Sequence, residues 1–318
     1  MDWSTVRGFN YQPSYGTTGL ELWMRFDAAT VDREIGLGKR YFPCMNALRI
    51  WLSWDAFKRD PAAFAAHFEQ ALAIADRYEC VVMPVLFNRR HDATLDYGGA
   101  YIDHFLHGAS WVQSADMFGP YLKAVVGAHA ADPRIVAWDL CNEPFSYVSP
   151  TDRIPEIVGA EYAWLRGLRD RCRVLGAQAP ITIGIHSGHA RAGLEQVDDI
   201  CDLLSIHPYW VPGGSRTKAE YERLLDQYVD VARRARKPII ASETCWGSLD
   251  DAARVAIIRY TLDQLRQRGI GWFAYLLHHS LIADAHRPEH GPVGPAGSLA
   301  FIEADGTLRP GHDAFNDY

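Results

Sequence analysis

The sequence has little of what marks a nucleic-acid-binding, membrane-spanning or disulfide-rich protein. It carries 32 basic and 39 acidic residues, a net charge of −7, and no basic stretch is dense enough to follow a phosphate backbone. No window approaches the roughly 18 unbroken apolar residues of a membrane span. The six cysteines are scattered singly, without a CxxC pair, and several lie in apolar runs where a buried free thiol is the usual state. We therefore expect neither nucleic acid nor a membrane as a partner.

The first residues also lack the marks of a secretory signal. Met1-Asp2-Trp3-Ser4 runs directly into an expected strand, without a basic start, an apolar stretch or a small-residue cleavage site. Together with the unpaired cysteines, this predicts a reduced, cytoplasmic protein. A chain from which a leader had been trimmed would look the same and would be secreted.

The chain does contain a regular alternation of short apolar runs with longer stretches of helical period. The short runs are rich in β-branched residues and almost continuously hydrophobic, as is typical of parallel strands covered by helices. We predict eight such strands, at Val6–Tyr11, Asn46–Trp51, Val81–Phe87, Ile135–Cys141, Ile181–Ile185, Asp202–His207, Pro238–Glu243 and Gly271–Leu277.

The stretches between these strands carry signals for the start of a helix. Thr217 with Glu220 forms a capping box, and Asp60 followed by Pro61 is a favourable N-cap and first-turn pair. Ser248 is expected to open the helix after the seventh strand. No internal repeat, low-complexity tract or flexible linker divides the chain, so a single domain over residues 1–318 is the economical interpretation.

Eight strand–helix units can close into a barrel or lie open as a doubly wound sheet. Eight strands enclose an interior that side chains just fill, which favours closure. An open nucleotide-binding sheet should have a Gly-rich turn after its first strand, whereas the turn here, Asn10-Tyr11-Gln12-Pro13-Ser14-Tyr15, is aromatic. The predicted fold class is α/β, a single (β/α)8 TIM barrel.

Two glutamates stand where a barrel places its functional groups, at the carboxyl ends of strands. Glu143 follows the fourth strand and Glu243 ends the seventh. Alternation along a strand puts Glu143 on the same face as Cys141, and Glu243 on the same face as Ala241. Because these neighbours are small, both acids are expected to point into the mouth of the barrel.

Two facing carboxylates suit the cleavage of a glycosidic bond. One must be protonated to release the leaving oxygen, while the other is ionised to attack the sugar or to activate water. Mutual repulsion keeps one proton on such a pair near neutral pH. The alternative is that each glutamate forms a salt bridge with a basic neighbour at the rim.

Asn142-Glu143-Pro144 after a hydrophobic strand resembles the fourth-strand signature of clan A glycoside hydrolases, particularly the cellulase-like family 5 group. Further segments resemble the family in the same order along the chain. They are Arg7-Gly8-Phe9-Asn10, Arg49-Ile50-Trp51, His207-Pro208-Tyr209, Glu243, Trp272 and the closing turn Ala304-Asp305-Gly306-Thr307-Leu308-Arg309-Pro310.

This resemblance implies a role for each matched residue. Glu143 would be the general acid/base and Glu243 the nucleophile, while Asn142 would hydrogen-bond the sugar 2-hydroxyl. Arg49 and Tyr209 would hydrogen-bond the nucleophile and favour its ionised form.

The resemblance also assigns two residues around the reacting sugar. His207 would face the same pocket, and Trp272 would offer a flat apolar face to the sugar. Trp272 has a simpler alternative, plain filling of the barrel, just as Arg49 has an alternative partner in Asp139, which alternation also points inward.

The chain departs from the family pattern at the end of the third strand. Many relatives have a histidine there, whereas this sequence has Asn88 followed by Arg89, Arg90 and His91. Asn88 or His91 is the candidate substitute, and the departure leaves open which sugar is bound.

Two long loops are expected to wall the sugar site. The segment from Asn88 to about Gln113 is rich in aromatic residues, which argues against disorder, and the segment from His278 to about Ser298 contains several histidines. The histidine spacings match no familiar ligand set, so we predict no metal and no cofactor.

The function predicted is a retaining glycoside hydrolase that cleaves a β-linked oligosaccharide or a small β-glycoside by double displacement. A transglycosylase would use the same residues, and a non-catalytic saccharide-binding barrel would be expected to lack one acid. A metal-dependent barrel hydrolase typically has His-x-His after its first strand, where this chain has Phe9-Asn10-Tyr11. Bulky loops favour a pocket over a groove. The oligomeric state is left open.

Overall fold

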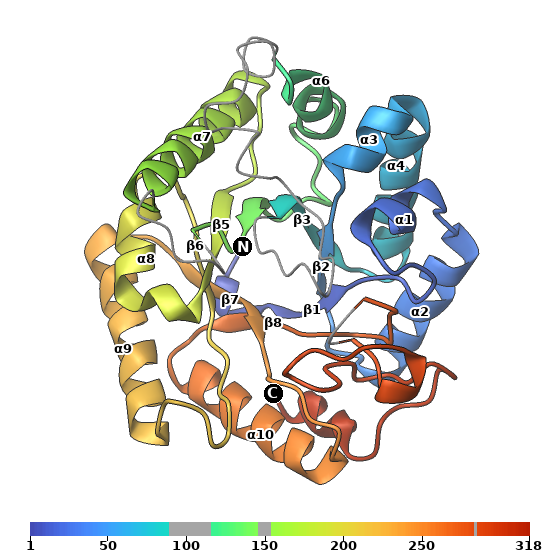
Figure 1. Ribbon diagram of the computed structural model, residues 1–318, viewed down its shortest axis with the longest axis vertical. Helices are drawn as coiled ribbons and strands as arrows, with labels where there is room; N and C mark the ends of the chain where they lie inside the picture. The colour runs from blue at the N-terminus through green and yellow to red at the C-terminus, as the bar shows by residue number, and fades with distance from the viewer. Residues whose placement is uncertain (89–115, 146–153, 283–284) are drawn as a thin grey trace.

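The computed structural model describes residues 1–88, 116–145, 154–282 and 285–318. Eight parallel strands form a closed barrel in chain order, with the last strand paired to the first (Figure 1). The strands are β1 Arg7–Tyr11, β2 Ala47–Trp51, β3 Val81–Asn88, β4 Trp138–Asn142, β5 Ile181–His186, β6 Leu204–His207, β7 Ile239–Thr244 and β8 Gly271–Ala274. The predicted (β/α)8 barrel is confirmed.

All eight predicted strands are present, and the largest differences are at their ends. β4 begins at Trp138, because Ile135 makes only an isolated bridge to Val82. β8 ends at Ala274, three residues earlier than predicted. Beyond it the backbone leaves the barrel ladder, and Leu276 exchanges hydrogen bonds with the closing segment 299–301 instead.

Helices surround the barrel on its outside (Figure 1). Those described are α1 Gly19–Met24, α2 Ala28–Tyr41, α3 Trp54–Arg59, α4 Pro61–Arg77, α6 Gly119–Leu122, α7 Ile154–Val174, α8 Ala190–Val197, α9 Lys218–Ala235 and α10 Asp251–Gln267. After β8, a short 3-10 helix at His312–Asp317 packs against α10. Within the described ranges, none of the helices has the length and apolarity to cross a bilayer.

The predicted helix starts are confirmed at two positions and wrong at a third. The Thr217–Glu220 capping box opens α9, and the Asp60 side chain accepts a hydrogen bond from the first turn of α4. The helix after β7 is capped by Asp250 instead of Ser248. The Ser248 hydroxyl accepts a hydrogen bond from the Asp250 amide, so Ser248 shapes the turn that leads to the cap.

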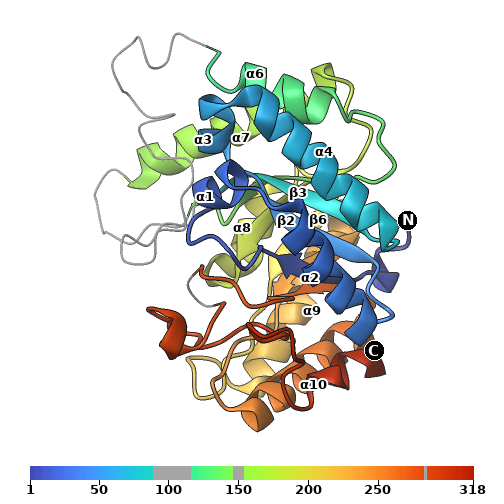
Figure 2. The same cartoon turned by 90° about the vertical axis from the view of Figure 1, so that its right-hand side faces the viewer.

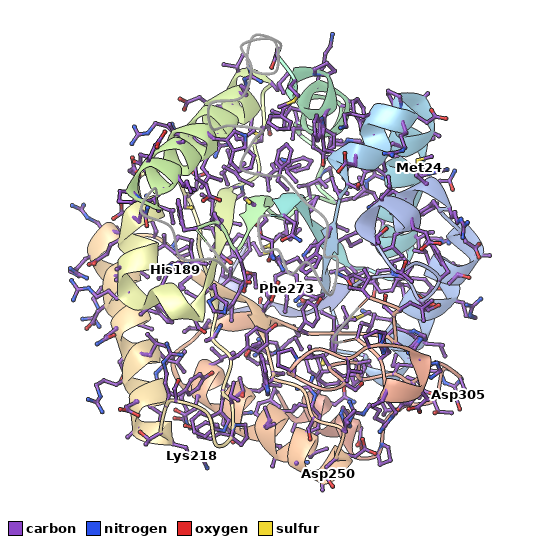
Figure 3. All side chains as sticks on the ribbon, viewed as in Figure 1. Met24, His189, Lys218, Asp250, Phe273 and Asp305 are labelled. Atoms are coloured by element: carbon purple, nitrogen blue, oxygen red, sulfur yellow. The ribbon has the colours of Figure 1, made fainter. Side chains whose placement is uncertain are left out.

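The two ends of the barrel interior differ in character. One buried apolar cluster closes the amino-terminal end; it consists of Val6, Ala47, Met83, Val136, Ala137, Leu203, Ile240 and Phe273. Figure 3 shows Phe273 near the centre of the ring, with Lys218, Asp250 and Asp305 at its periphery. Both chain termini lie at one end of the molecule (Figure 2). Polar side chains are gathered at the other end, where the strands finish.

Candidate active site

A fully buried arginine from β2 organises the mouth of the barrel. Nη1 of Arg49 lies 2.6 Å from Oε1 of Glu243, and Nη2 lies 2.9 Å from Oδ2 of Asp139. The same guanidinium donates to the side-chain oxygens of Asn10 and Asn142. Burial alone would lower the pKa of Arg49, but the two carboxylates outweigh it and raise that pKa. Both sequence interpretations of Arg49 therefore hold at once.

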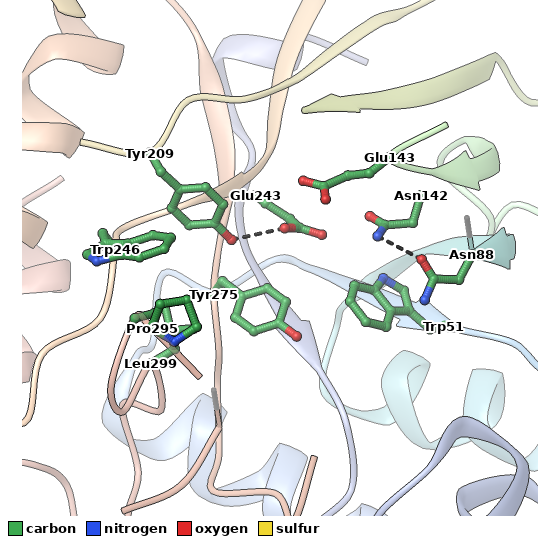
Figure 4. Close-up of a pocket in the computed structure, with 11 residues that line it drawn as sticks. Trp51, Asn88, Asn142, Glu143, Tyr209, Glu243, Trp246, Tyr275, Pro295 and Leu299 are labelled. Carbon is green, nitrogen blue, oxygen red and sulfur yellow. Dashed lines mark hydrogen bonds between the residues drawn. The ribbon is translucent and has the colours of Figure 1, made fainter. Parts of the chain in front are cut away.

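Glu243 receives a donor on each of its oxygens. Oε1 accepts from Arg49, and Oε2 accepts from the Tyr209 hydroxyl at 2.9 Å (Figure 4). Burial, together with the nearby Glu243 charge, raises the pKa of Tyr209 well above its ordinary value, so the phenol remains a donor. These two contacts, predicted from the family resemblance, fix the direction in which the carboxylate points.

Glu143 sits in a sharp turn directly after β4. Its φ is 46°, in the left-handed region that few residues other than glycine adopt, and its amide donates to the carbonyl of Gly184 on β5. Oε1 of Glu143 lies 2.8 Å from Nδ1 of His207, and that nitrogen is 3.5 Å from Oε2 of Glu243. One side-chain nitrogen or oxygen from each of these three residues lies within 4.8 Å of the others.

The inward direction of Glu143 does not come from simple strand alternation with Cys141. Asp139 and Asn142 lie three positions apart, yet both contact Arg49 inside the barrel. The pairing of β4 with β5 shifts register between those two residues. Such an irregularity bends a strand and re-aims its side chains.

The same correction applies to β7, where Ala241 was expected to share a face with Glu243. Instead, the adjacent residues Ser242 and Glu243 both approach His207. Oγ of Ser242 lies 3.0 Å from Nε2 of His207, and Oε2 of Glu243 lies 3.5 Å from Nδ1. The register of β7 against β8 shifts between Ala241 and Thr244. Both acids reach the mouth because irregularities in their strands turn them inward.

The two acids open onto a pocket of about 470 Å³. Asn142 lies at one side of it, and its amide nitrogen donates to the Asn88 side-chain oxygen at 3.0 Å, so Asn88 does lie at the site (Figure 4). The pocket is lined by Trp51, Asn88, Asn142, Glu143, Tyr209, Glu243, Trp246, Tyr275, Pro295, Ala296 and Leu299.

The prediction that Trp272 offers a face to the sugar is wrong. Trp272 pairs in register with Arg7 near the amino-terminal end of β8, and its ring is fully buried. The Arg7 guanidinium lies 3.9 Å from the centre of that ring, and Phe315 and Tyr318 pack against its edge. The neighbouring Phe273 belongs to the interior cluster, so Trp272 packs on the outer face of the barrel wall, and the alternative of plain barrel filling does not describe it either.

Three aromatic residues of the pocket were not predicted as site residues. Trp51 ends β2, Trp246 follows β7, and Tyr275 is the first residue after β8. Trp51 pairs with Tyr275 at 5.9 Å between ring centres, and Tyr209 pairs with Trp246 at 5.4 Å. Their position at strand ends was the signal that could have identified them.

The loop after β8 does contribute a wall, since Pro295, Ala296 and Leu299 line the pocket. Most of the predicted loop after β3, His91 included, lies outside the described residues, as do residues 283–284 of the loop after β8. Among the described histidines of the β8 loop, His279 and His290 pack with ring centres 4.6 Å apart. None of the described loop histidines belongs to a group with metal-binding spacing.

No protein-family model matches the chain. A curated relative, β-glucuronidase from Felis catus, is 25% identical over 199 residues, which are 62% of this chain. The matched part is 26% of that protein, so the chain corresponds to about a quarter of its length.

Solved structures resemble the chain over almost its whole length. Exo-β-1,4-mannosidase from Opitutaceae bacterium strain TAV5 has a TM-score of 0.72 at 18% identity, covering 98% of this chain and 58% of that one. GH5_18 from Streptomyces cattleya, in complex with GlcNAc, has a TM-score of 0.74 at 16% identity, with coverage of 98% and 78%. A family 5 mannosidase from Rhizomucor miehei scores 0.64 at 13% identity, with coverage of 98% and 92%. The chain therefore has the fold of the clan A, family 5-like glycoside hydrolases.

Proposed function

We propose that the protein is a retaining glycoside hydrolase, with Glu143 as general acid/base and Glu243 as nucleophile. The observation that carries the proposal is the pair of carboxylates at the barrel mouth, with an oxygen of each within 4.8 Å. Carboxyl groups about 5 Å apart suit direct attack on the sugar, whereas about 6.5–9.5 Å leaves room for a water molecule. The spacing favours double displacement.

In the first step, a Glu243 oxygen attacks the anomeric carbon while the glycosidic C–O bond breaks. The Glu143 proton passes to the departing oxygen, so the leaving group departs as an alcohol. In the second step, Glu143 accepts a proton from water as that water attacks the anomeric carbon. The bond from the sugar to Glu243 breaks as the bond to water forms, Glu243 departs as a carboxylate, and configuration is retained.

The surroundings of the two acids suit these different roles. Arg49 and Tyr209 each donate to one oxygen of Glu243, which stabilises the carboxylate form that attacks. Glu143 has the imidazole of His207 beside it, with Nδ1 2.8 Å from its Oε1. A divalent ion could also span Glu143, His207 and Glu243, but the Arg49 guanidinium 2.6 Å from Glu243 already supplies the positive charge.

The pocket supports a β-linked oligosaccharide or a small β-glycoside as substrate. Four aromatic rings, of Trp51, Tyr209, Trp246 and Tyr275, face the space beside Glu243 and can pack on the C–H faces of a sugar (Figure 4). The loop segment Pro295–Leu299 closes one side. The structural neighbours named above include an exo-β-1,4-mannosidase, and we propose action on a chain end or a small glycoside.

A panel of aryl β-glycosides tests the proposal, with the anomer of the first-formed product followed by proton NMR. We expect a β product that later mutarotates; a product that first forms as the α anomer would exclude double displacement. Release of mid-chain fragments from a polymer, with short aryl glycosides left intact, would contradict the proposed action on a chain end or a small glycoside. Transfer to an added sugar acceptor in preference to water would identify a transglycosylase.

Glu243→Ala tests the nucleophile separately. Turnover should fall by roughly 10⁴-fold or more, as removal of a nucleophile does in other enzymes. Added azide should restore part of the activity and give a glycosyl azide of inverted configuration. Ordinary activity without azide would refute the assignment.

A further inference from the structure

A chain of hydrogen bonds leads from the barrel interior to Glu143. The hydroxyl of Ser205 on β6 lies 2.5 Å from that of Ser242 on β7. The Ser242 hydroxyl lies 3.0 Å from Nε2 of His207, and Nδ1 of His207 lies 2.8 Å from Oε1 of Glu143. All four side chains are fully buried. Neither serine was a predicted site residue, and neither takes part in the reaction steps proposed above.

The number of donors and acceptors along these hydrogen bonds favours one donor direction, from Ser205 towards Glu143. If Ser205 donates to Ser242, then Ser242 donates to Nε2 of His207, and the imidazole carries its hydrogen on Nδ1. Every hydroxyl and N–H then has an acceptor, with Glu143 as the last one.

The opposite direction leaves a hydrogen without an acceptor. If Nε2 of His207 carries a hydrogen, it donates to Ser242, which must then donate to Ser205. The Ser205 hydroxyl has no other hydrogen-bond partner among the described residues, so its own hydrogen would stay buried and unpaired. An unsatisfied buried donor carries a desolvation cost, which disfavours this direction.

We infer that Ser205 and Ser242 are positioning residues that hold His207 with its hydrogen on Nδ1. Oε1 of Glu143 then accepts a hydrogen bond from His207. The acidic proton of Glu143 is consequently carried on the other oxygen, Oε2, instead of being shared with the imidazole. The serine pair thereby decides which Glu143 oxygen delivers the proton to a leaving group. This consequence rests on the function proposed above.

Close packing keeps His207 in this position. A Cβ added to Gly184 on β5 would stand 2.6 Å from Nε2 of His207 and 3.2 Å from Nη2 of Arg49, so the glycine makes room for both side chains. Glu243 approaches Nδ1 at 3.5 Å, and Asp139 also interacts electrostatically with the ring. The imidazole therefore has little freedom to turn away from Glu143.

The tautomer can be measured directly by nitrogen-15 NMR of protein labelled at its imidazole nitrogens. The His207 signals are assigned by their loss in His207→Gln. In the unmodified protein we expect a protonated Nδ1 and an unprotonated Nε2. Ser242→Ala should shift both signals towards the values of a mixture of the two His207 tautomers. Ser242→Thr, which keeps the hydroxyl, should restore the original pattern. An unprotonated Nδ1 in the unmodified protein would overturn the inference.

The catalytic consequence is measured by comparing leaving groups. For an alkyl β-glycoside, which needs protonation, Ser242→Ala should lower kcat/KM by about tenfold or more. For a dinitrophenyl β-glycoside, which needs none, the change should stay within about twofold. A merely structural defect would lower both values together, and that result would also overturn the inference.

Two further variants sharpen the comparison. Ser205→Ala should give a smaller effect than Ser242→Ala, because Ser242 can still donate to His207 but is no longer held to that direction. Thr261→Val, on α10, is the matched control. It removes a fully buried hydroxyl that has no hydrogen-bond partner among the described residues, and it should change neither the tautomer nor the ratio of the two kcat/KM values. If the unmodified protein cleaves no glycoside, the proposed function fails, while the NMR result still decides the tautomer.

Discussion

Two fully buried arginines lie near the pocket and are stabilised in different ways. Arg49 lies inside the barrel and pairs with the carboxylates of Asp139 and Glu243. Arg254, on α10, lies behind the pocket wall, and within the described part of the chain no carboxylate pairs with it. Its donors reach the backbone carbonyls of Cys245, Trp246, Tyr275 and Leu299. The pKa values move accordingly: the carboxylates raise that of Arg49, whereas burial lowers that of Arg254 to about 10.

This difference separates an arginine that acts on a candidate catalytic residue from one that holds the pocket wall in place. Arg49 pairs with and orients Glu243, the proposed nucleophile. Arg254 ties together three segments whose side chains Trp246, Tyr275 and Leu299 line the pocket. A guanidinium has five donors and no acceptor, so one buried cation can satisfy several carbonyls at a junction of loops. Replacing each arginine should therefore damage a different property.

Arg49→Met should have the largest effect on activity. Glu243 loses its donor at 2.6 Å, and we expect kcat/KM to fall on the order of 10³-fold, at the upper end of the loss from removing one catalytic donor. Two buried carboxylates lose their cation, so the free energy of unfolding should drop by about 3–5 kcal/mol at pH 7. Initial rates measure the change in kcat/KM, and urea unfolding measures the change in the free energy of unfolding.

The pH dependence of that loss is diagnostic. Burial raises the pKa of Asp139 and Arg49 opposes this, so without Arg49 the Asp139 carboxyl is protonated more readily. The stability gap between the variant and the unmodified protein should narrow at pH 5. Activity close to normal in Arg49→Met would show that Glu243 does not depend on this pair.

Arg254→Met should act mainly on stability. Four carbonyls lose their donor in a buried setting, and the free energy of unfolding should fall by about 2–4 kcal/mol. Since Arg254 touches neither acid, kcat should stay within about threefold while KM rises as the wall loosens. A kcat loss as deep as that of Arg49→Met would remove the distinction between the two arginines.

The burial of His312 makes the stability of the fold sensitive to acid. It is fully buried beside Arg254 and Arg309, and burial together with these two charges lowers its pKa to about 3. The unfolded chain binds this proton near pH 6.5, the folded chain only near pH 3, so stability is complete above pH 6.5 and is lost as the pH falls. Between pH 7 and pH 5 this residue should cost about 2 kcal/mol.

His312→Gln removes that titration. Urea unfolding of both proteins at pH 7 and pH 5 measures it, and the variant should lose about 2 kcal/mol less stability between the two pH values. An equal loss in both proteins would show that His312 does not titrate as stated.

The fold could be predicted from the sequence because its strands are nearly continuous apolar runs. β3 and β5 begin at the residues expected, and the Thr217–Glu220 capping box opens α9 as its spacing required. Both acids could be located as well, since a barrel places functional groups where strands end. These features depend on residues that are close together in the sequence, so a single sequence without homologues was enough to predict them.

What could not be predicted depends on contacts between distant segments. The register shifts that turn Asn142 and Glu243 inward are set by pairing with the next strand, and sequence alternation cannot reveal them. The Ser205–Ser242 contact joins residues 37 positions apart. Trp272 was misplaced because its role was taken from the resemblance of the eighth strand to the family, whereas the aromatic ring that lines the pocket just after β8 belongs to Tyr275.

The last pair of variants compares Tyr275, which lines the pocket, with the misplaced Trp272. Tyr275→Ala removes a ring that faces the sugar space, so KM should rise about tenfold, the scale of one lost aromatic contact, while stability changes little. Trp272→Phe should leave KM unchanged and lower the free energy of unfolding by about 1–3 kcal/mol, because it shrinks a ring packed between Arg7, Phe315 and Tyr318. Michaelis kinetics and urea unfolding of the two variants separate these outcomes. If KM rose in Trp272→Phe and not in Tyr275→Ala, the sugar would pack on Trp272 and not on Tyr275. That outcome would contradict the full burial of the Trp272 ring.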